Sequence, residues 1–414
     1  METLTIIFLI FMFFAIYFFV FFFILFFKNR EILFSYPEPK TDFKVSVIMP
    51  AYNEEESIED TVNHVMQLNY PKDKLELIVV NDESSDGTLK ILRRLESKYK
   101  NLKVIDKKNS GKADSVNWGI RASKGELIAI VDCDSFPSKD SLKKLTGYFR
   151  DPKMSAVTSF VYARNKDESF FTKLQSVEYI IMAFTRKLLD YVDSVYVTNG
   201  PLSLYRKEYI LKVGGFDPKT VTEDVDITWN LLKHGYKTSM CMDAGVSTIV
   251  PNDFKRWYHQ RVRWGLGGLQ ALVKYRAIFL RKGMFGMFVL PYVSFSIIVS
   301  MYLFLLTSYL LLKSILQNIM IYFYSAVANT YIFSMQDINL YPSVTLFYFI
   351  LLFVMSFGFS LYILKRTNYE ERTIPKLFNL VFYSVIYLTI YAVLWFPAFY
   401  RFFSGDMRWG KDDR

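Results

Sequence analysis

Hydrophobic positions follow two different patterns along this chain. Residues 4–27 form one uninterrupted apolar run, LTIIFLIFMFFAIYFFVFFFILFF, without a charged side chain. A helix of about 20 apolar residues spans the hydrocarbon of a bilayer, so this run predicts a transmembrane helix. The run is too long for the core of a secretory signal, no basic residue precedes it, and no small-residue cleavage site follows it. We therefore expect the mature chain to keep it.

Three further uncharged stretches are long enough to cross a bilayer, at residues 284–312, 343–364 and 377–400. We expect four spans in all, with a fifth crossing near residues 320–333 as the alternative. The positive-inside rule places Lys28 and Arg30 in the cytoplasm. It does not settle the side of the C-terminal tail, because the loop before the last stretch and the tail after it each carry four Lys or Arg residues.

No run of this length occurs between residues 31 and 283. The chain is 52% hydrophobic and 22% charged, too apolar for an ordinary soluble protein and too charged for an entirely membrane-embedded one. A cytosolic domain inserted between membrane helices accounts for both. The expected units are a transmembrane helix (1–30), a cytosolic domain (31–250), amphipathic interfacial helices (251–283), about three transmembrane helices (284–403) and a tail (404–414).

Short apolar runs alternate with helix-like segments in the first half of the cytosolic region. The runs are VSVIMP (45–50), LELIVV (75–80), LKVI (102–105) and ELIAIV (126–131), and the helical segments lie at 55–68, 87–99, 112–123 and 138–150. This alternation predicts an α/β fold, with a parallel sheet covered by helices on both faces. Ligands bind such sheets beyond the carboxyl ends of the strands, so the residues that follow each run are the candidates for chemistry.

Acidic residues gather at these strand ends. Asp132 and Asp134 follow the fourth run, and Asp82 follows the second. A lone D-x-D is more often a solvated turn, but at a strand end its two carboxylates offer hard oxygen ligands to Mg²⁺ or Mn²⁺. No G-x-G-x-x-G follows the first strand and no Walker A sequence is present, which disfavours dinucleotide and P-loop chemistry.

The segment VTEDVDITWNLLKHGYK (221–237) predicts a helix capped by Thr222, with Glu223 and Asp224 in its first turn. One interpretation of T-E-D is purely structural, as an ordinary helix cap. The other interpretation is catalytic: Asp224, held at the rim of the site, accepts a proton from an attacking hydroxyl.

The net charge, the cysteines and the histidines do not point to a specific reaction. The net charge of +10 fits the topology of a membrane protein better than nucleic-acid binding, for which no recognition motif is present. Cys133 and Cys241 form no C-x-x-C pattern, so neither a disulfide nor zinc is implied. We interpret His64 and His234 as surface residues.

The stretch WYHQRVRWGLGG (257–268) stands just before the membrane runs. At helical spacing Gln260, Arg263 and Trp264 share one face. We expect Trp257 and Arg261 to point elsewhere, toward lipid headgroups. The three glycines that close the stretch are expected to loosen or end the helix.

Taken in order, these motifs resemble those of a known family. They are PAYNEE, NDESSDGT, GKADSVNWG, DCD, NGPLSLYRKE with GGFD, VTED and QRVRW. Set between membrane spans, they look like the membrane-integrated family 2 glycosyltransferases of GT-A fold, and in particular the processive polysaccharide synthases that make poly-N-acetylglucosamine, hyaluronan and cellulose. The resemblance covers about residues 44–268.

On the donor side, the resemblance implies that Tyr52, Glu54 and Asp82 border a uridine pocket and that Lys112 lies near the diphosphate. Of the D-x-D pair, Asp134 is implied as the metal ligand, and Asp132 lies nearer the nucleotide sugar.

On the acceptor side, the resemblance makes Asp224 the general base, beside Glu223 as a substrate-binding residue. Gln260, Arg263 and Trp264 match the family's Q-x-x-R-W element, which binds the diphosphate and the acceptor end.

Two positions depart from the family pattern. Glu83 stands where a glycine is more common, which bears on the shape of the uridine loop, and Asn199 stands where many synthases have Ser, which bears on the acceptor pocket. No cytosolic domain follows the last apolar run in this sequence, which favours the poly-N-acetylglucosamine type over the cyclic-dinucleotide-regulated cellulose synthases.

The expected activity is inverting transfer of a sugar, most simply N-acetylglucosamine, from a UDP-sugar to a growing β-linked glycan, with Mg²⁺ or Mn²⁺. The expected partners are the donor, a glycan acceptor, membrane lipid and a small membrane or export subunit, at the plasma membrane with the catalytic domain in the cytoplasm. Single-sugar addition to a lipid-linked or protein-linked glycan is one alternative, and a catalytically silent nucleotide-binding membrane protein is another.

Overall fold

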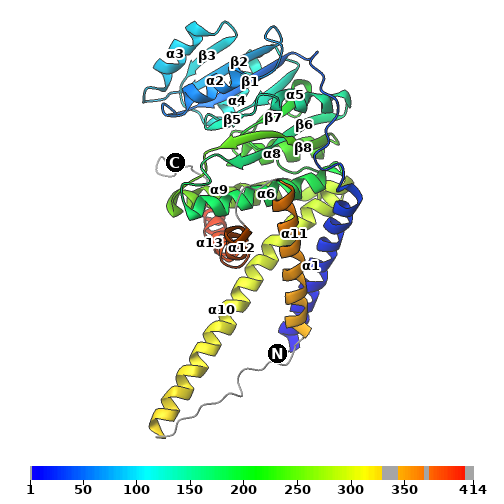
Figure 1. The fold of residues 1–414 in the computed structure, drawn as a ribbon, viewed down its shortest axis with the longest axis vertical. Helices are drawn as coiled ribbons and strands as arrows, with labels where there is room; N and C mark the ends of the chain where they lie inside the picture. Colours follow the sequence, from blue (N-terminus) through cyan, green and yellow to red (C-terminus); the bar gives the residue numbers. More distant parts are fainter. Residues whose placement is uncertain (1, 329–343, 368–372, 406–414) are drawn as a thin grey trace.

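The computed structural model describes residues 2–328, 344–367 and 373–405. Three layers are stacked along its long axis (Figure 1). An α/β domain forms one end, helices α6 (Phe170–Asp190) and α9 (Phe254–Lys274) lie across its base, and long apolar helices run away from that base.

An eight-stranded sheet in the order β3-β2-β1-β4-β7-β6-β8-β5 forms the centre of the α/β domain. Its first four strands in this order are parallel, and they match the four predicted runs. They are β1 (Val45–Ala51), β2 (Leu75–Asp82), β3 (Leu102–Lys107) and β4 (Leu127–Ile130). β1 is apolar on both faces and buried at six of its seven positions, as expected of a strand between two helical layers.

The other half of the sheet mixes directions and has no counterpart among the predicted runs. β7 is antiparallel to β4 and β6, whereas β6 and β8 are parallel to each other. These strands are β5 (Ser135–Pro137), β6 (Met154–Ala163), β7 (Ser203–Arg206) and β8 (Lys237–Thr248). The predicted parallel pattern therefore describes half of the sheet.

Short amphipathic helices cover the sheet close to their predicted positions. They are α2 (Ile58–Met66), α3 (Thr88–Lys98), α4 (Lys112–Ala122), α5 (Ser141–Thr146) and α8 (Glu223–Lys233), and a further short helix, α7 (Lys207–Lys212), was not predicted. α2 shows the rule, since Ile58, Val62 and Val65 are buried at helical spacing while Glu59 and Asp60 are exposed.

Three described helical segments are long and apolar enough to cross a membrane: Ile6–Asn29, Phe285–Val327 and Lys376–Ser404. They fall on α1 (Glu2–Asn29), on α10 (Leu290–Val327), and on α12 (Thr373–Phe382), which the π-helical turn η5 (Tyr383–Tyr387) joins to α13 (Leu388–Ser404). α11 (Val344–Arg366), also apolar, falls on the span expected at residues 343–364. Residues 320–327 continue α10 without a break and Ala328 follows as its C-cap, whereas residues 329–333 of the alternative fifth crossing lie outside the described residues.

Candidate active site

Two cavities meet at the carboxyl ends of the parallel strands. The strand-end cavity, about 160 Å³, lies over β1, β2 and the turn after β4. The interfacial cavity, about 560 Å³, extends from the same turn to α6, α9 and α13. Lys112, Asp132 and Asp134 line both cavities, so the two form one continuous site with these residues at the junction.

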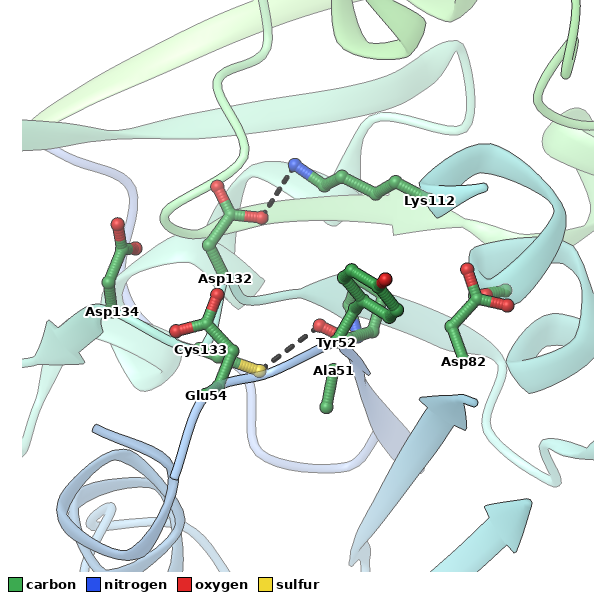
Figure 2. A pocket seen from close by; sticks show the side chains of 10 residues that line it. Ala51, Tyr52, Glu54, Asp82, Lys112, Asp132, Cys133 and Asp134 are labelled. Carbon is green, nitrogen blue, oxygen red and sulfur yellow. Dashed lines mark hydrogen bonds and ion pairs between the residues drawn. The ribbon is translucent and has the colours of Figure 1, made fainter. Parts of the chain in front are cut away.

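Tyr52, Glu54 and Asp82 line the strand-end cavity, and Figure 2 shows the Tyr52 ring between Asp82 and the Asp132–Asp134 pair. The Asp82 carboxylate already accepts three hydrogen bonds, from Lys107 Nζ at 2.5 Å and from the backbone N–H groups of Ser110 and Gly111 at 3.1 Å each. These bonds fix the loop before α4 and leave one acceptor position on the carboxylate for a ligand donor.

Glu83 has a backbone φ of 62°, in the left-handed region that glycine favours. Its carboxylate accepts a hydrogen bond from the backbone N–H of Asn109 at 3.1 Å. The loop thus keeps the backbone shape of a glycine position, and the extra side chain ties the ends of β2 and β3 together.

Lys112, the first residue of α4, bridges two carboxylates from distant parts of the chain. Its Nζ lies 2.7 Å from Asp132 Oδ1 and 2.9 Å from Glu223 Oε1 (Figure 2 shows the Asp132 contact). Burial by itself lowers the pKa of this ammonium, but the two carboxylates together raise it well above its usual value. Burial opposes ionisation of Glu223 too, yet the Lys112 charge leaves the Glu223 pKa lowered. Lys112 and Glu223 are therefore both ionised at neutral pH.

Asp134 and Asp224 have the opposite environment, because neither carboxylate forms an ion pair within the part of the chain that the structure describes. Burial, and then the Asp132 charge, raises the pKa of Asp134 to about 6. Burial, and then the Glu223 charge, raises the pKa of Asp224 to about 6. Asp224 stands in the first turn of α8, at the wall of the interfacial cavity. A carboxylate with this pKa is suited to accept a proton near neutral pH.

A divalent cation would suit the Asp132–Asp134 pair. The two carboxylates lie one residue apart, the Asp134 carboxylate forms no ion pair among the described residues, and carboxylate oxygens are the ligands that Mg²⁺ and Mn²⁺ prefer. No cluster of three or more His, Cys, Asp or Glu side chains able to hold a metal occurs among the described residues. Further ligands would then come from water or from a substrate's phosphates.

Gln260, Arg263 and Trp264 line the interfacial cavity from one face of α9. The expectation that the glycines after Trp264 end this helix is wrong, because α9 continues to Lys274. A Cβ atom on Gly267 would lie 2.0 Å from Thr222 Oγ1, and one on Gly265 would lie 3.2 Å from the Ala398 side chain. The missing side chains instead allow α9 to touch α8 on one side and α13 on the other.

The loop before α8 is held against α9 by hydrogen bonds as well. Gln270 Oε1 accepts from the Val221 N–H at 3.0 Å, and the Arg263 guanidinium donates to the Val221 carbonyl at 3.5 Å. Thr222 is the N-cap residue as predicted, but its hydroxyl makes no capping bond. It packs on Gly267, so the T-E-D segment takes its position from α9.

Trp257 and Arg261 are not at a lipid surface as expected, because both are buried. Trp257 packs against Phe171 and Tyr387, and Arg261 pairs with Glu178 of α6 at 2.5 Å. The face of α9 that carries these two residues therefore packs against protein.

Further residues of the interfacial cavity were missed from the sequence. They are Glu178, Tyr179 and Arg186 of α6, and Tyr391 and Trp395 of α13. The sequence offered one signal for them, an acidic residue within an apolar run, because Glu178 stands in SVEYIIMAF. In the structure Glu178 is 2% exposed. Buried acids of this kind are rare unless they are paired.

Comparisons with known proteins agree with this geometry. Residues 41–267, more than half of the chain, match the family described as "Glycosyltransferase like family 2". A poly-β-1,6-N-acetyl-D-glucosamine synthase of Staphylococcus epidermidis is 28% identical over 393 residues, covering 93% of this chain and 91% of the relative. The protein of that name from Staphylococcus aureus strain COL is 31% identical over 254 residues, 59% of this chain and 61% of its own.

Among solved structures, a mannosyltransferase from Pyrobaculum calidifontis, in complex with GDP-mannose and Mn²⁺, has a TM-score of 0.61 at 17% identity. The likeness covers 97% of this chain and 98% of that one, and it shows a shared fold that includes the long helices. The GT-A fold expected from the motifs is confirmed, and this protein belongs to glycosyltransferase family 2.

Proposed function

We propose that this protein is an inverting membrane glycosyltransferase that transfers N-acetylglucosamine from UDP-N-acetylglucosamine to a growing β-linked polysaccharide, processively and with coupled export. The observation that carries the proposal is the end-to-end match to a poly-β-1,6-N-acetyl-D-glucosamine synthase, which includes the membrane helices as well as the α/β domain. The two joined cavities supply a place for a donor on the sheet side and for an acceptor on the membrane side.

Asp224 acts as the general base in this proposal. It would take the proton of the acceptor hydroxyl as that oxygen attacks the anomeric carbon on the face opposite the leaving UDP, which inverts the configuration. Its raised pKa follows from burial and from Glu223. Glu223, paired with Lys112, stays ionised and keeps the ammonium beside the donor.

Donor binding belongs to the strand-end cavity. Tyr52, Glu54 and Asp82 would surround the uridine, with Lys112 beside the diphosphate. Asp134 would hold Mg²⁺ or Mn²⁺, while Asp132, fixed by Lys112, faces the nucleotide sugar. When bound, the cation supplies charge neutralisation for the departing diphosphate.

Acceptor binding belongs to the α9 face. Gln260 and Trp264 would contact the terminal sugar of the acceptor, and Arg263 would stabilise the leaving diphosphate from the opposite side of the junction. The interfacial cavity continues past them to Tyr391 and Trp395 of α13, so an acceptor seated there would already point toward the membrane helices.

We further propose that the protein is a multi-pass component of the plasma membrane with the α/β domain in the cytoplasm. α1 runs from the N mark toward that domain (Figure 1), with Lys28 in its last turn and Arg30 just after it, as the positive-inside rule requires. The α/β domain would then occupy residues 31–250, between the first membrane helix and the helices that follow residue 251. Apolar side chains exposed on the long helices, such as Leu311 at 61%, would contact lipid or a small membrane or export subunit.

Purified full-length protein, incubated with single UDP-sugars and Mn²⁺ or Mg²⁺, tests the proposal when its products are sized. A ladder formed from UDP-N-acetylglucosamine is the expected result. One added sugar would establish the alternative of single addition to a lipid-linked or protein-linked glycan. Absence of turnover with every donor would establish a catalytically silent membrane protein.

A further inference from the structure

Arg261, the first arginine of QRVRW, is a buried cation with no part in the proposed chemistry. Its guanidinium pairs with Glu178 of α6 at 2.5 Å, and the two side chains are 0% and 3% exposed. Both side chains line the interfacial cavity, and Val177, Val262 and Ala398 of α6, α9 and α13 belong to one apolar cluster. Burying two charges costs several kcal/mol per ion, so such a pair is weak evidence for a gain in stability.

The same guanidinium contacts two of the residues that we assign to the acceptor. One of its Nη atoms donates a hydrogen bond to Gln260 Oε1, and its Cζ lies 4.0 Å from the centre of the Trp264 ring. Arginine has donors and no acceptor, so Gln260 has to turn its amide oxygen toward Arg261. The Gln260 amide nitrogen is thereby left to donate to an oxygen of a ligand in the interfacial cavity.

On its other side Glu178 is held by the last membrane-spanning segment. The Tyr387 hydroxyl donates to Glu178 Oε2 at 2.7 Å, and the Tyr391 hydroxyl donates to Oε1. Trp257 of α9 donates to the Tyr387 hydroxyl at 2.6 Å. An ion pair and hydrogen bonds thus connect α9, α6 and α13, between residues that are 83 to 213 positions apart in the sequence.

We propose that Arg261 is a positioning residue of the acceptor site, one that orients the Gln260 amide and the Trp264 ring and, through Glu178, keeps them in register with the last membrane helix. The inference rests on the proposed function, because it assigns Gln260 and Trp264 to the acceptor. The ligand group it selects is an oxygen able to accept a hydrogen bond, such as a sugar hydroxyl or an acetamido carbonyl.

The test is Arg261→Lys in the full-length protein, because lysine keeps the charge beside Glu178 but cannot donate in two directions or lie flat on Trp264. UDP release is measured against the concentration of a short β-1,6-linked N-acetylglucosamine oligosaccharide, and UDP affinity is measured separately. We expect the acceptor KM to rise about tenfold, the order expected for loss of one charge-assisted hydrogen bond, with UDP affinity unchanged. Gln260→Glu replaces the hydrogen-bond donor of the amide with a carboxylate oxygen. It should likewise raise the KM for the oligosaccharide and leave UDP affinity unchanged.

Arg256→Lys is the matched control, since Arg256 lies on α9 one turn earlier with its side chain 65% exposed. It should match the unmutated protein in both measurements. A second test variant, Glu178→Gln combined with Arg261→Met, removes both charges together and leaves neither one buried alone. It should repeat the rise in acceptor KM.

An acceptor KM that stays at the unmutated value in Arg261→Lys overturns the inference. So does a parallel loss of UDP affinity, or failure of both Arg261 variants to bind UDP, because either result assigns the pair to folding. If the unmutated protein does not use UDP-N-acetylglucosamine, the proposed function fails by itself. The same KM comparison is then made with the acceptor and UDP-sugar that the unmutated protein turns over.

Discussion

The two halves of the site are built in different ways. The strand-end half is assembled from residues at or just after the ends of β1, β2 and β4, and two of its carboxylates pair with lysines, Asp82 with Lys107 and Asp132 with Lys112. The interfacial half is assembled from α6, α8, α9 and α13, and its contacts join segments up to 213 residues apart. Under the proposed function, donor binding is a local property of the sheet, whereas acceptor binding depends on how helices pack at the membrane.

The junction of the two halves should be the most sensitive place. Asp134→Asn, or removal of divalent cations with EDTA, should lower transfer on the order of a thousandfold, because a bound cation supplies several kcal/mol of charge stabilisation. Sugar transfer at saturating donor is the measurement, and Asp167→Asn, at an exposed position, is the control. Full activity in EDTA would contradict the proposed role of a divalent cation at Asp134.

A change confined to the interfacial half should separate transfer from donor binding. Gly267→Val places a side chain where Thr222 already lies. The T-E-D segment must then shift, and a displacement of about 1 Å can cost on the order of a hundredfold in rate. Transfer rate and UDP affinity are measured together, with Val273→Ala as control, since Val273 lies on α9 with its side chain exposed. Equal loss of both properties would contradict the division into halves.

The reverse separation is expected in the strand-end half. Asp82→Asn removes the charge that holds Lys107 and the loop before α4. UDP affinity should fall about tenfold, the order of a lost charge-assisted hydrogen bond, while the acceptor KM stays unchanged. Calorimetric titration with UDP checks the first value and transfer kinetics the second. An unchanged UDP affinity would place the uridine elsewhere.

The two halves should also differ in their response to pH. Asp224 acts as a base only when ionised, and its pKa is raised to about 6. Transfer should therefore fall as the pH falls through about 6, to about a tenth at pH 5, the fraction still ionised one unit below the pKa. Saturating cation keeps Asp134 ionised during the titration, and UDP binding should vary less than transfer. A flat rate between pH 7 and pH 5 would contradict the base assignment.

The sequence predicted the strand-end half well because its signals are local. Four apolar runs gave β1 to β4, and the acids that follow them lie together because parallel strands end at one edge. The interfacial half could not be predicted in the same way. Helix propensity alone suggested that the glycines after Trp264 end α9, whereas close contact with Thr222 and Ala398 keeps the helix continuous.

Arg261 and Trp257 show the same limit. Beside a membrane, their residue types indicate headgroup contact, and only the packing of α6 and α13 reveals that both are buried. Glu178, the partner of Arg261, could have been noticed as an acid in an apolar run, but nothing in the sequence pairs it with a residue 83 positions away.

The most direct test of the account is Asp224→Asn, with transfer from UDP-N-acetylglucosamine and UDP affinity measured on the same sample. The substitution keeps the shape of the side chain and removes its basicity. We expect transfer to fall by about 10² to 10⁴, the usual contribution of a general base, with UDP affinity within about twofold of the unmutated value. Retained transfer, or loss of UDP binding together with transfer, would contradict the account.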